Sequence, residues 1–187
     1  MIKNTQMLLI VLFLMVKASI HAQTTENDSL RNPISEYYLT DLKLREVAQL
    51  IVNDSISPTD NNVTLSIMDS IVNGTPESRN YFSNAFGIII IKSDGALSEV
   101  IGQYCINSIH RNPNELLSWL SAGKLPSTPE SIAGYITYEL VISSTPNKDK
   151  EELINKIKHD ANTPYQIKYA NKFITLIEDD FERQSGG

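Results

Sequence analysis

The amino-acid sequence predicts an all-α fold of about eight short helices that run antiparallel to their neighbours. Three observations lead to this class. Seven of the eight prolines follow a Ser, Thr or Asn, the distances between these pairs are nearly constant, and apolar residues recur at steps of three and four. The side chain of Ser, Thr or Asn accepts a hydrogen bond from the first turn of a helix, and proline suits the next position because its missing N–H would have no partner there. Each pair therefore indicates the start of a helix.

The spacing of the pairs sets the lengths of the helices. With the cap-like cluster Ser93-Asp94-Gly95 counted among the starts, every step after the first helix is 16 to 19 residues. A step of this size holds a helix of roughly three to four turns and a short connection, and short connections make successive helices antiparallel. We expect helix starts near residues 33, 58, 76, 94, 113, 129, 146 and 164, at Ser93-Asp94-Gly95 and after Asn32-Pro33, Ser57-Pro58, Thr75-Pro76, Asn112-Pro113, Thr128-Pro129, Thr145-Pro146 and Thr163-Pro164.

Apolar periodicity supports the individual helices. The helix after Pro33, the helix after Ser93 and the last helix each carry an apolar stripe, and a one-sided helix must bury its stripe against another element. The stripes are Tyr38, Leu42, Val47, Leu50 and Ile51 in the first helix, Leu97, Val100, Ile101, Tyr104, Cys105 and Ile109 in the second, and Ile167, Ala170, Phe173, Ile174, Ile177 and Phe181 in the last.

The segment from Phe86 to Ile91 allows two interpretations. Its four consecutive isoleucines are typical of a β-strand, but the rest of the sequence offers no clear partner strand. Tyr81, Phe82, Ala85, Phe86, Ile89 and Ile90 also form a helical stripe. Because a helix that is apolar on all sides is a central one, we favour a buried middle helix.

The domain organisation follows from these elements. Residues 32–183 are expected to form a single all-α domain, after a flexible lead-in at residues 23–31 and before a loose tail at residues 184–187. A helical pair of about 36 residues resembles the period of tetratricopeptide and HEAT repeats. The arrangement is therefore either an irregular bundle or an array of helical pairs of that kind.

The first 22 residues are typical of a secretory signal peptide. Lys3 supplies the positive start, and the ten apolar residues Met7 to Val16 form a core that is shorter than the roughly 20 residues of a membrane span. Cleavage is expected between Ala22 and Gln23, with a cut after Ala18 or an uncleaved anchor as alternatives. The mature chain would be periplasmic or secreted, with no membrane span.

Composition excludes several functional classes. The chain has 187 residues, 41% hydrophobic residues, one cysteine and a formal net charge of −6, which becomes −8 without the first 22 residues. One cysteine cannot form a disulfide framework or a cysteine zinc site, and the absence of a basic tract argues against nucleic-acid binding. The acidic charge could favour a basic partner or serve solubility alone.

Candidate catalytic residues are few. His110, His159, Asp160 and Asp179 stand in an order that resembles the metal ligands of HD-type phosphohydrolases, which are all-helical. That resemblance implies a divalent metal that activates water, whereas the lysines around His159 favour a solvated helix end. Cys105 and the only tryptophan, Trp119, are expected in the core, and Trp119 could instead mark a binding patch.

Three short motifs suggest modification of the chain. Asp28-Ser29-Leu30, Asp54-Ser55-Ile56 and Asp69-Ser70-Ile71 resemble the acceptor pattern of a periplasmic O-glycosylation system of some Gram-negative bacteria. This resemblance implies Ser29, Ser55 and Ser70 as glycosylation sites, with Ser70 the weakest because it falls within an expected helix.

Together these features predict an exported small helical protein that acts as a non-enzymatic binding or structural module. We expect no cofactor, and we expect a protein rather than a nucleic acid as partner. The alternative is a metal-dependent hydrolase that uses His110, His159, Asp160 and Asp179.

Overall fold

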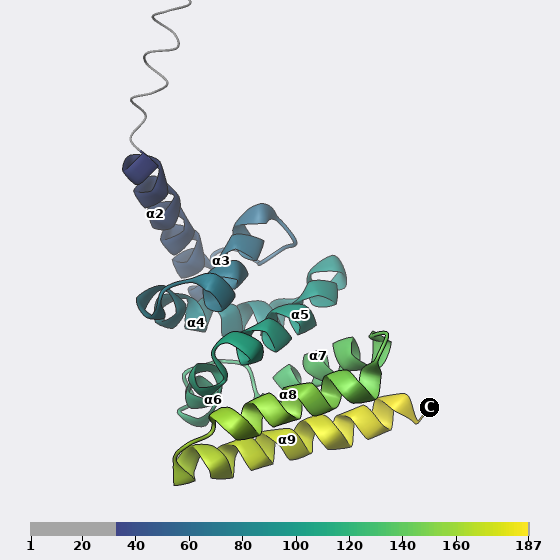
Figure 1. The fold of residues 1–187 in the computed structure, drawn as a ribbon. Helices are drawn as coiled ribbons and strands as arrows, with labels where there is room; N and C mark the ends of the chain where they lie inside the picture. The colour runs from purple at the N-terminus through teal and green to yellow at the C-terminus, as the bar shows by residue number, and fades with distance from the viewer. Residues whose placement is uncertain (1–32, 187) are drawn as a thin grey trace, which may run out of the picture. The chain divides into compact units, whose positions relative to one another are not determined.

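The structure, a computed structural model, describes residues 33–186 and is all-helical over that range (Figure 1). The predicted signal peptide with its cleavage site at Ala22 and Gln23, the lead-in at 23–31, and Ser29 lie outside the described residues. The helices within the described range are α2 (Pro33–Val52), α3 (Asn62–Asn73), α4 (Pro76–Lys92), α5 (Gly95–Arg111), α6 (Pro113–Ser121), α7 (Pro129–Ile142), α8 (Pro146–Asp160) and α9 (Pro164–Ser185).

Threonine caps start three of these helices as the sequence predicts. Thr75, Thr128 and Thr163 each accept a hydrogen bond of 3.2 Å from the backbone N–H three residues later. Helices α6 and α8 also begin at the predicted prolines, although the side chains of Asn112 and Thr145 make no capping hydrogen bond. Proline alone can define such a start because its φ is already helical.

One predicted helix start is wrong by four residues. Helix α3 begins at Asn62 rather than after Ser57-Pro58, and Pro58 is buried in the loop that precedes it. The cap is Asn61, whose Oδ1 accepts hydrogen bonds of 3.0 Å from the N–H groups of Val63 and Thr64. A side chain that accepts two of the unpaired N–H groups of the first turn defines this start better than the Ser-Pro pair, which also suits turns.

The isoleucine-rich segment forms a buried helix, which confirms the favoured interpretation. Phe86 and Ile89 are fully buried in α4, whereas Ile91 is 54% exposed. Gly87 lies so close to the loop before α7 that a β-carbon there would stand 2.4 Å from Cδ of Pro126. Packing of this kind outweighs the preference of β-branched residues for strands.

The contacts divide the chain into two compact units, Met1–Lys43 and Leu44–Gly187. In the second unit α5 and α7 each pack against four other helices: α5 against α3, α6, α7 and α8, and α7 against α4, α5, α8 and α9. The most extensive packing interfaces link α3 with α4, α5 with α7, and α7 with α9. Helices α8 and α9 also lie side by side (Figure 1). One of the three largest interfaces, between α3 and α4, therefore joins successive helices, whereas the other two join helices with one helix between them in the sequence.

The last helix is longer than the sequence predicts. The expected loose tail at residues 184–187 does not begin at Gln184, because α9 continues to Ser185. The Gln184 amide donates a hydrogen bond of 2.9 Å to Thr137 Oγ1, which holds this turn against α7, and one of 2.8 Å to Asp180 Oδ2 within α9. Gly187 lies outside the described residues, and the outer bounds 32–183 of the domain stay a prediction.

No helix in the described part of the chain has both the length and the apolar character needed to cross a membrane.

Candidate functional site

The residues of the hydrolase alternative do not form a site together. The side chains of His110, His159 and Asp179 are exposed, and Asp160 pairs with its neighbour His159 at 2.7 Å and with Lys156 at 2.9 Å. Hydrogen bonds from His159 and Lys156 lower the pKa of the Asp160 carboxyl. Among the described residues, no group of three or more His, Cys, Asp or Glu side chains is placed to hold a metal ion. The convergence that an HD-type centre needs is therefore not present.

Cys105 and Trp119 belong to the core, as predicted. Cys105 is fully buried in α5, and burial raises the pKa of its thiol to about 12. A thiol with so high a pKa is protonated at neutral pH and is a poor nucleophile. Trp119 is 4% exposed, so its core interpretation is correct and it marks no surface patch.

Two of the three predicted modification sites lie within the described residues and differ in their exposure. Ser55 is exposed in the loop between α2 and α3. Ser70 lies within α3, half-buried, and its hydroxyl donates a hydrogen bond of 2.9 Å to the backbone carbonyl of Ser66. Glycosylation at either serine stays a prediction, with Ser55 the more accessible acceptor.

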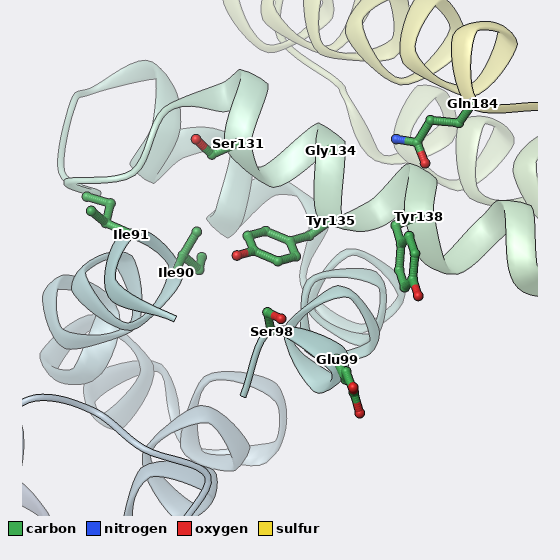
Figure 2. Close-up of a pocket in the computed structure, with 9 residues that line it drawn as sticks. All are labelled: Ile90, Ile91, Ser98, Glu99, Ser131, Gly134, Tyr135, Tyr138 and Gln184. Atoms are coloured by element: carbon green, nitrogen blue, oxygen red, sulfur yellow. The ribbon is translucent and has the colours of Figure 1, made fainter. Parts of the chain in front are cut away.

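The largest of three cavities in the described part of the chain lies where α4, α5 and α7 meet, with a volume of about 620 Å³ (Figure 2). Tyr135 and Tyr138 of α7 line it together with Ile90 and Ile91 of α4, and Glu99 of α5 stands at its edge. Tyr138 is 50% exposed, so this cavity presents large apolar side chains to solvent. In Figure 2 the Tyr135 ring reaches from α7 toward Ile90.

A hydrogen bond holds one wall of this cavity in place. The Tyr135 hydroxyl lies 2.6 Å from the Ser93 hydroxyl at the end of α4, and either oxygen can be the donor. This bond connects the end of α4 to α7 and fixes the orientation of the Tyr135 ring in the wall of the cavity.

Two smaller cavities also involve α5 and α7: the first is lined by α5, α7 and α8, and the second by α3 and α5 with Glu139 of α7. They have volumes of about 400 and 360 Å³. The smaller one shares Glu99 with the largest cavity, and Gln103 and Glu139 line both of the smaller ones. The three cavities together are called the α5–α7 trough below. At the far end of the trough, Ile142 of α7 is 61% exposed.

The charge along the trough is acidic. The described residues that line its three cavities include five acids and one histidine but no Lys or Arg. Three of the acids have local partners. Glu152 pairs with Lys148 at 3.6 Å, Asp149 accepts a hydrogen bond of 2.8 Å from Thr145, and Asp69 accepts one of 2.7 Å from the Asn73 amide. The ionisable lining residues are Asp69, Glu99, Glu139, Asp149, Glu152 and His110.

Glu139 stands at the centre of this charge pattern. Its side chain packs over Gly102 of α5, where a β-carbon would lie 2.3 Å from Glu139 Cγ and 2.5 Å from the carbonyl oxygen of Tyr135. The glycine thus lets α5 and α7 approach closely and leaves the carboxylate half-buried between them. Burial raises the pKa of the Glu139 carboxyl. Within the described residues this carboxylate has no hydrogen bond or ion pair.

Comparison of the chain with protein-family models, with curated proteins and with solved structures finds no match. The inference of function therefore rests on the trough itself.

Proposed function

We propose that this chain is an exported, non-enzymatic binding module that holds a partner protein in the α5–α7 trough. One observation carries the proposal: large apolar side chains of α4 and α7 are exposed inside the cavities of the trough. Ile91 and Tyr138 stand in the largest cavity and Ile142 in the next. Exposed apolar side chains that gather in a concave surface with a polar rim are typical of interaction sites.

The size of the cavities supports a ligand-binding role. Ligand pockets in proteins have volumes of roughly 300–1,000 Å³, and all three cavities of the trough fall in this range. Three neighbouring cavities that share Glu99, Gln103 and Glu139 suit an extended segment with several side chains better than one compact small molecule. Tyr135 and Tyr138, which line the largest cavity, also support an interface, because tyrosine is enriched among the residues that dominate binding energies.

Export is the second part of the proposal. It rests on Lys3 and the apolar run from Met7 to Val16, which are typical of a cleaved secretory signal. N-terminal sequencing of the exported product should begin at Gln23, or at Ser19 for the alternative cut. Recovery of the whole chain from Met1 in the membrane fraction would contradict cleavage.

Site-specific photo-crosslinking in the source organism tests the binding role. A benzophenone amino acid at position 138 lies in the trough, and the same group at position 165 provides a matched control, because Tyr165 of α9 is 61% exposed outside the trough. We expect a discrete adduct from position 138 that excess wild-type protein suppresses, and none from position 165. Absence of any adduct at position 138, or equal adducts at both positions, would refute the trough as the binding site.

A further inference from the structure

We infer that the occupant of the α5–α7 trough is a basic segment of the partner protein, whose Lys or Arg side chains lie along the acids and whose apolar side chains contact Ile91, Tyr138 and Ile142. This inference rests on the proposed function and names the chemical class of its partner. The argument uses the sign of the charge, its distribution, and the apolar walls between the charges.

The sign of the charge selects a cationic partner. Glu99 and Glu139 belong to the cavities that meet along α5 and α7, and no Lys or Arg among the described residues lines those cavities. An acidic segment would face repulsion at each of these carboxylates, whereas a basic one would gain from all of them. Figure 2 shows Tyr138 and Glu99 projecting toward the same side of the cavity.

The distribution of the charge selects a chain rather than a single ion. The five acids are spread over three cavities, and no three of them are placed to hold a metal ion. A row of separate carboxylates is complementary to several cations that are spaced along a peptide.

The apolar walls suit the side chains of lysine and arginine as well as neighbouring apolar residues. These two side chains bury their methylene stems on apolar surface while the charged end stays near polar groups. In the largest cavity Ile91 and Tyr138 provide such a surface, with the Glu99 carboxylate at its edge. A guanidinium group over the face of Tyr138 would add a cation–π contact.

Glu139 gains most from a basic occupant. Its carboxylate is half-buried and has no hydrogen bond or ion pair within the described residues. Burial raises its pKa, so the charged form is disfavoured in the free protein. A Lys or Arg of the partner beside it would supply the missing counter-charge.

Fluorescence anisotropy with labelled peptides tests this class on the intact mature chain. The probes are a short synthetic peptide that repeats Arg-Ala-Leu and one of equal length that repeats Glu-Ala-Leu. We expect saturable binding of the basic peptide, weaker binding at higher salt, and no binding of the acidic peptide. Free arginine amide should bind far more weakly than the basic peptide, because it engages one cavity only.

Substitutions in the trough test which residues bind the basic peptide. Glu99→Gln and Glu139→Gln should each weaken the affinity about twofold to fivefold, as the loss of one ion pair does. Tyr138→Ala should weaken it by about tenfold, as truncation of a central aromatic residue does. The matched control is Glu151→Gln, which removes the same charge from an exposed position of α8 outside the cavities and should leave the affinity unchanged. Circular dichroism and urea unfolding of each variant check that it is folded.

The outcomes separate this inference from the proposed function. If position 138 forms its adduct but the basic peptide does not bind, or binds no better than the acidic one, the trough is a binding site and the basic class is wrong. If Glu151→Gln weakens binding as much as Glu139→Gln, the attraction is due to net charge and the inference fails. If neither the adduct nor peptide binding is found, the proposed site itself is wrong.

Discussion

Gly102→Ala should destabilise the fold because α5 and α7 touch at this glycine. A β-carbon there would lie 2.3 Å from Glu139 Cγ and 2.5 Å from the carbonyl oxygen of Tyr135. The Glu139 side chain can rotate away, but the carbonyl is part of the α7 backbone and moves only if the two helices separate. Gly134→Ala is the matched control, since its nearest neighbour, Asp180 Oδ2, is 3.9 Å away.

The magnitude follows from two opposing effects. Alanine in place of glycine inside a helix stabilises by about 1 kcal/mol. An added carbon in a packed interface costs roughly 1–3 kcal/mol, and occasionally more. With two contacts at or below 2.5 Å, Gly102→Ala should lie at the upper end of this cost, which leaves a net loss of about 1–2 kcal/mol. Gly134→Ala meets no such contact and should gain about 0.5–1 kcal/mol.

Urea unfolding of the wild-type chain and both variants, compared at similar m-values, measures this difference. The two substitutions are chemically identical and both lie inside helices, so propensity and denatured-state effects largely cancel. Separation of the helices should also weaken binding of the basic peptide to the Gly102→Ala variant. If Gly102→Ala is as stable as Gly134→Ala, the close approach of α5 and α7 at this position is wrong.

Three further predictions test the core and the charge of the trough. Ile89→Ala removes a fully buried side chain and should lower the free energy of unfolding by about 2–5 kcal/mol. Thr128→Ala removes a helix cap and should lower it by about 1 kcal/mol. Equal losses of this free energy in urea unfolding would contradict the burial of α4. Burial raises the pKa of the Cys105 thiol to about 12, so a thiol reagent at mildly alkaline pH should label it only as fast as the chain unfolds, and immediate labelling would contradict that burial. Burial also raises the pKa of Glu139, so its carboxyl group binds a proton more tightly in the folded chain than in the unfolded chain. Ionisation of this carboxyl therefore reduces the stability of the fold as pH rises through the raised pKa. Glu139→Gln should therefore be more stable than wild type at neutral pH, and this gain should shrink as pH falls through the raised pKa and be absent below pH 4.5, the ordinary value for this carboxyl.

Local sequence signals predict most of the helix starts. At Thr75, Thr128 and Thr163 a capping oxygen and a following proline act together, and each helix begins at that proline. The similar pair Ser57-Pro58 lies in a loop instead, and Asn61 is the cap of the helix that follows. A cap acts through hydrogen bonds within one turn, so a sequence can reveal it, but several polar residues in a row compete for the role.

The trough could not be predicted in the same way, although part of its signal is present. In α7 the buried residues Ile132, Ile136 and Leu140 form one face, while Tyr138 and Ile142 recur four residues apart on another. A helix with two apolar faces is equally compatible with full burial. Which face stays exposed depends on where α5 and α9 pack, and that is decided by tertiary contacts rather than by spacing.

Two side chains of α7 do not stabilise the free protein but would favour the proposed binding. Glu139 is half-buried without a counter-charge in the described part of the chain, so its ionised form weakens the fold, and Tyr138 leaves half of its surface in water. Neither feature contributes to the core, and both would become favourable if the proposed basic and apolar segment covered them. Residues that serve a partner often reduce the stability of the free protein. The combination expected for Glu139→Gln, higher stability with weaker binding of the basic peptide, is the signature of such a residue. A loss of both properties would instead make Glu139 a structural residue of the α5–α7 interface.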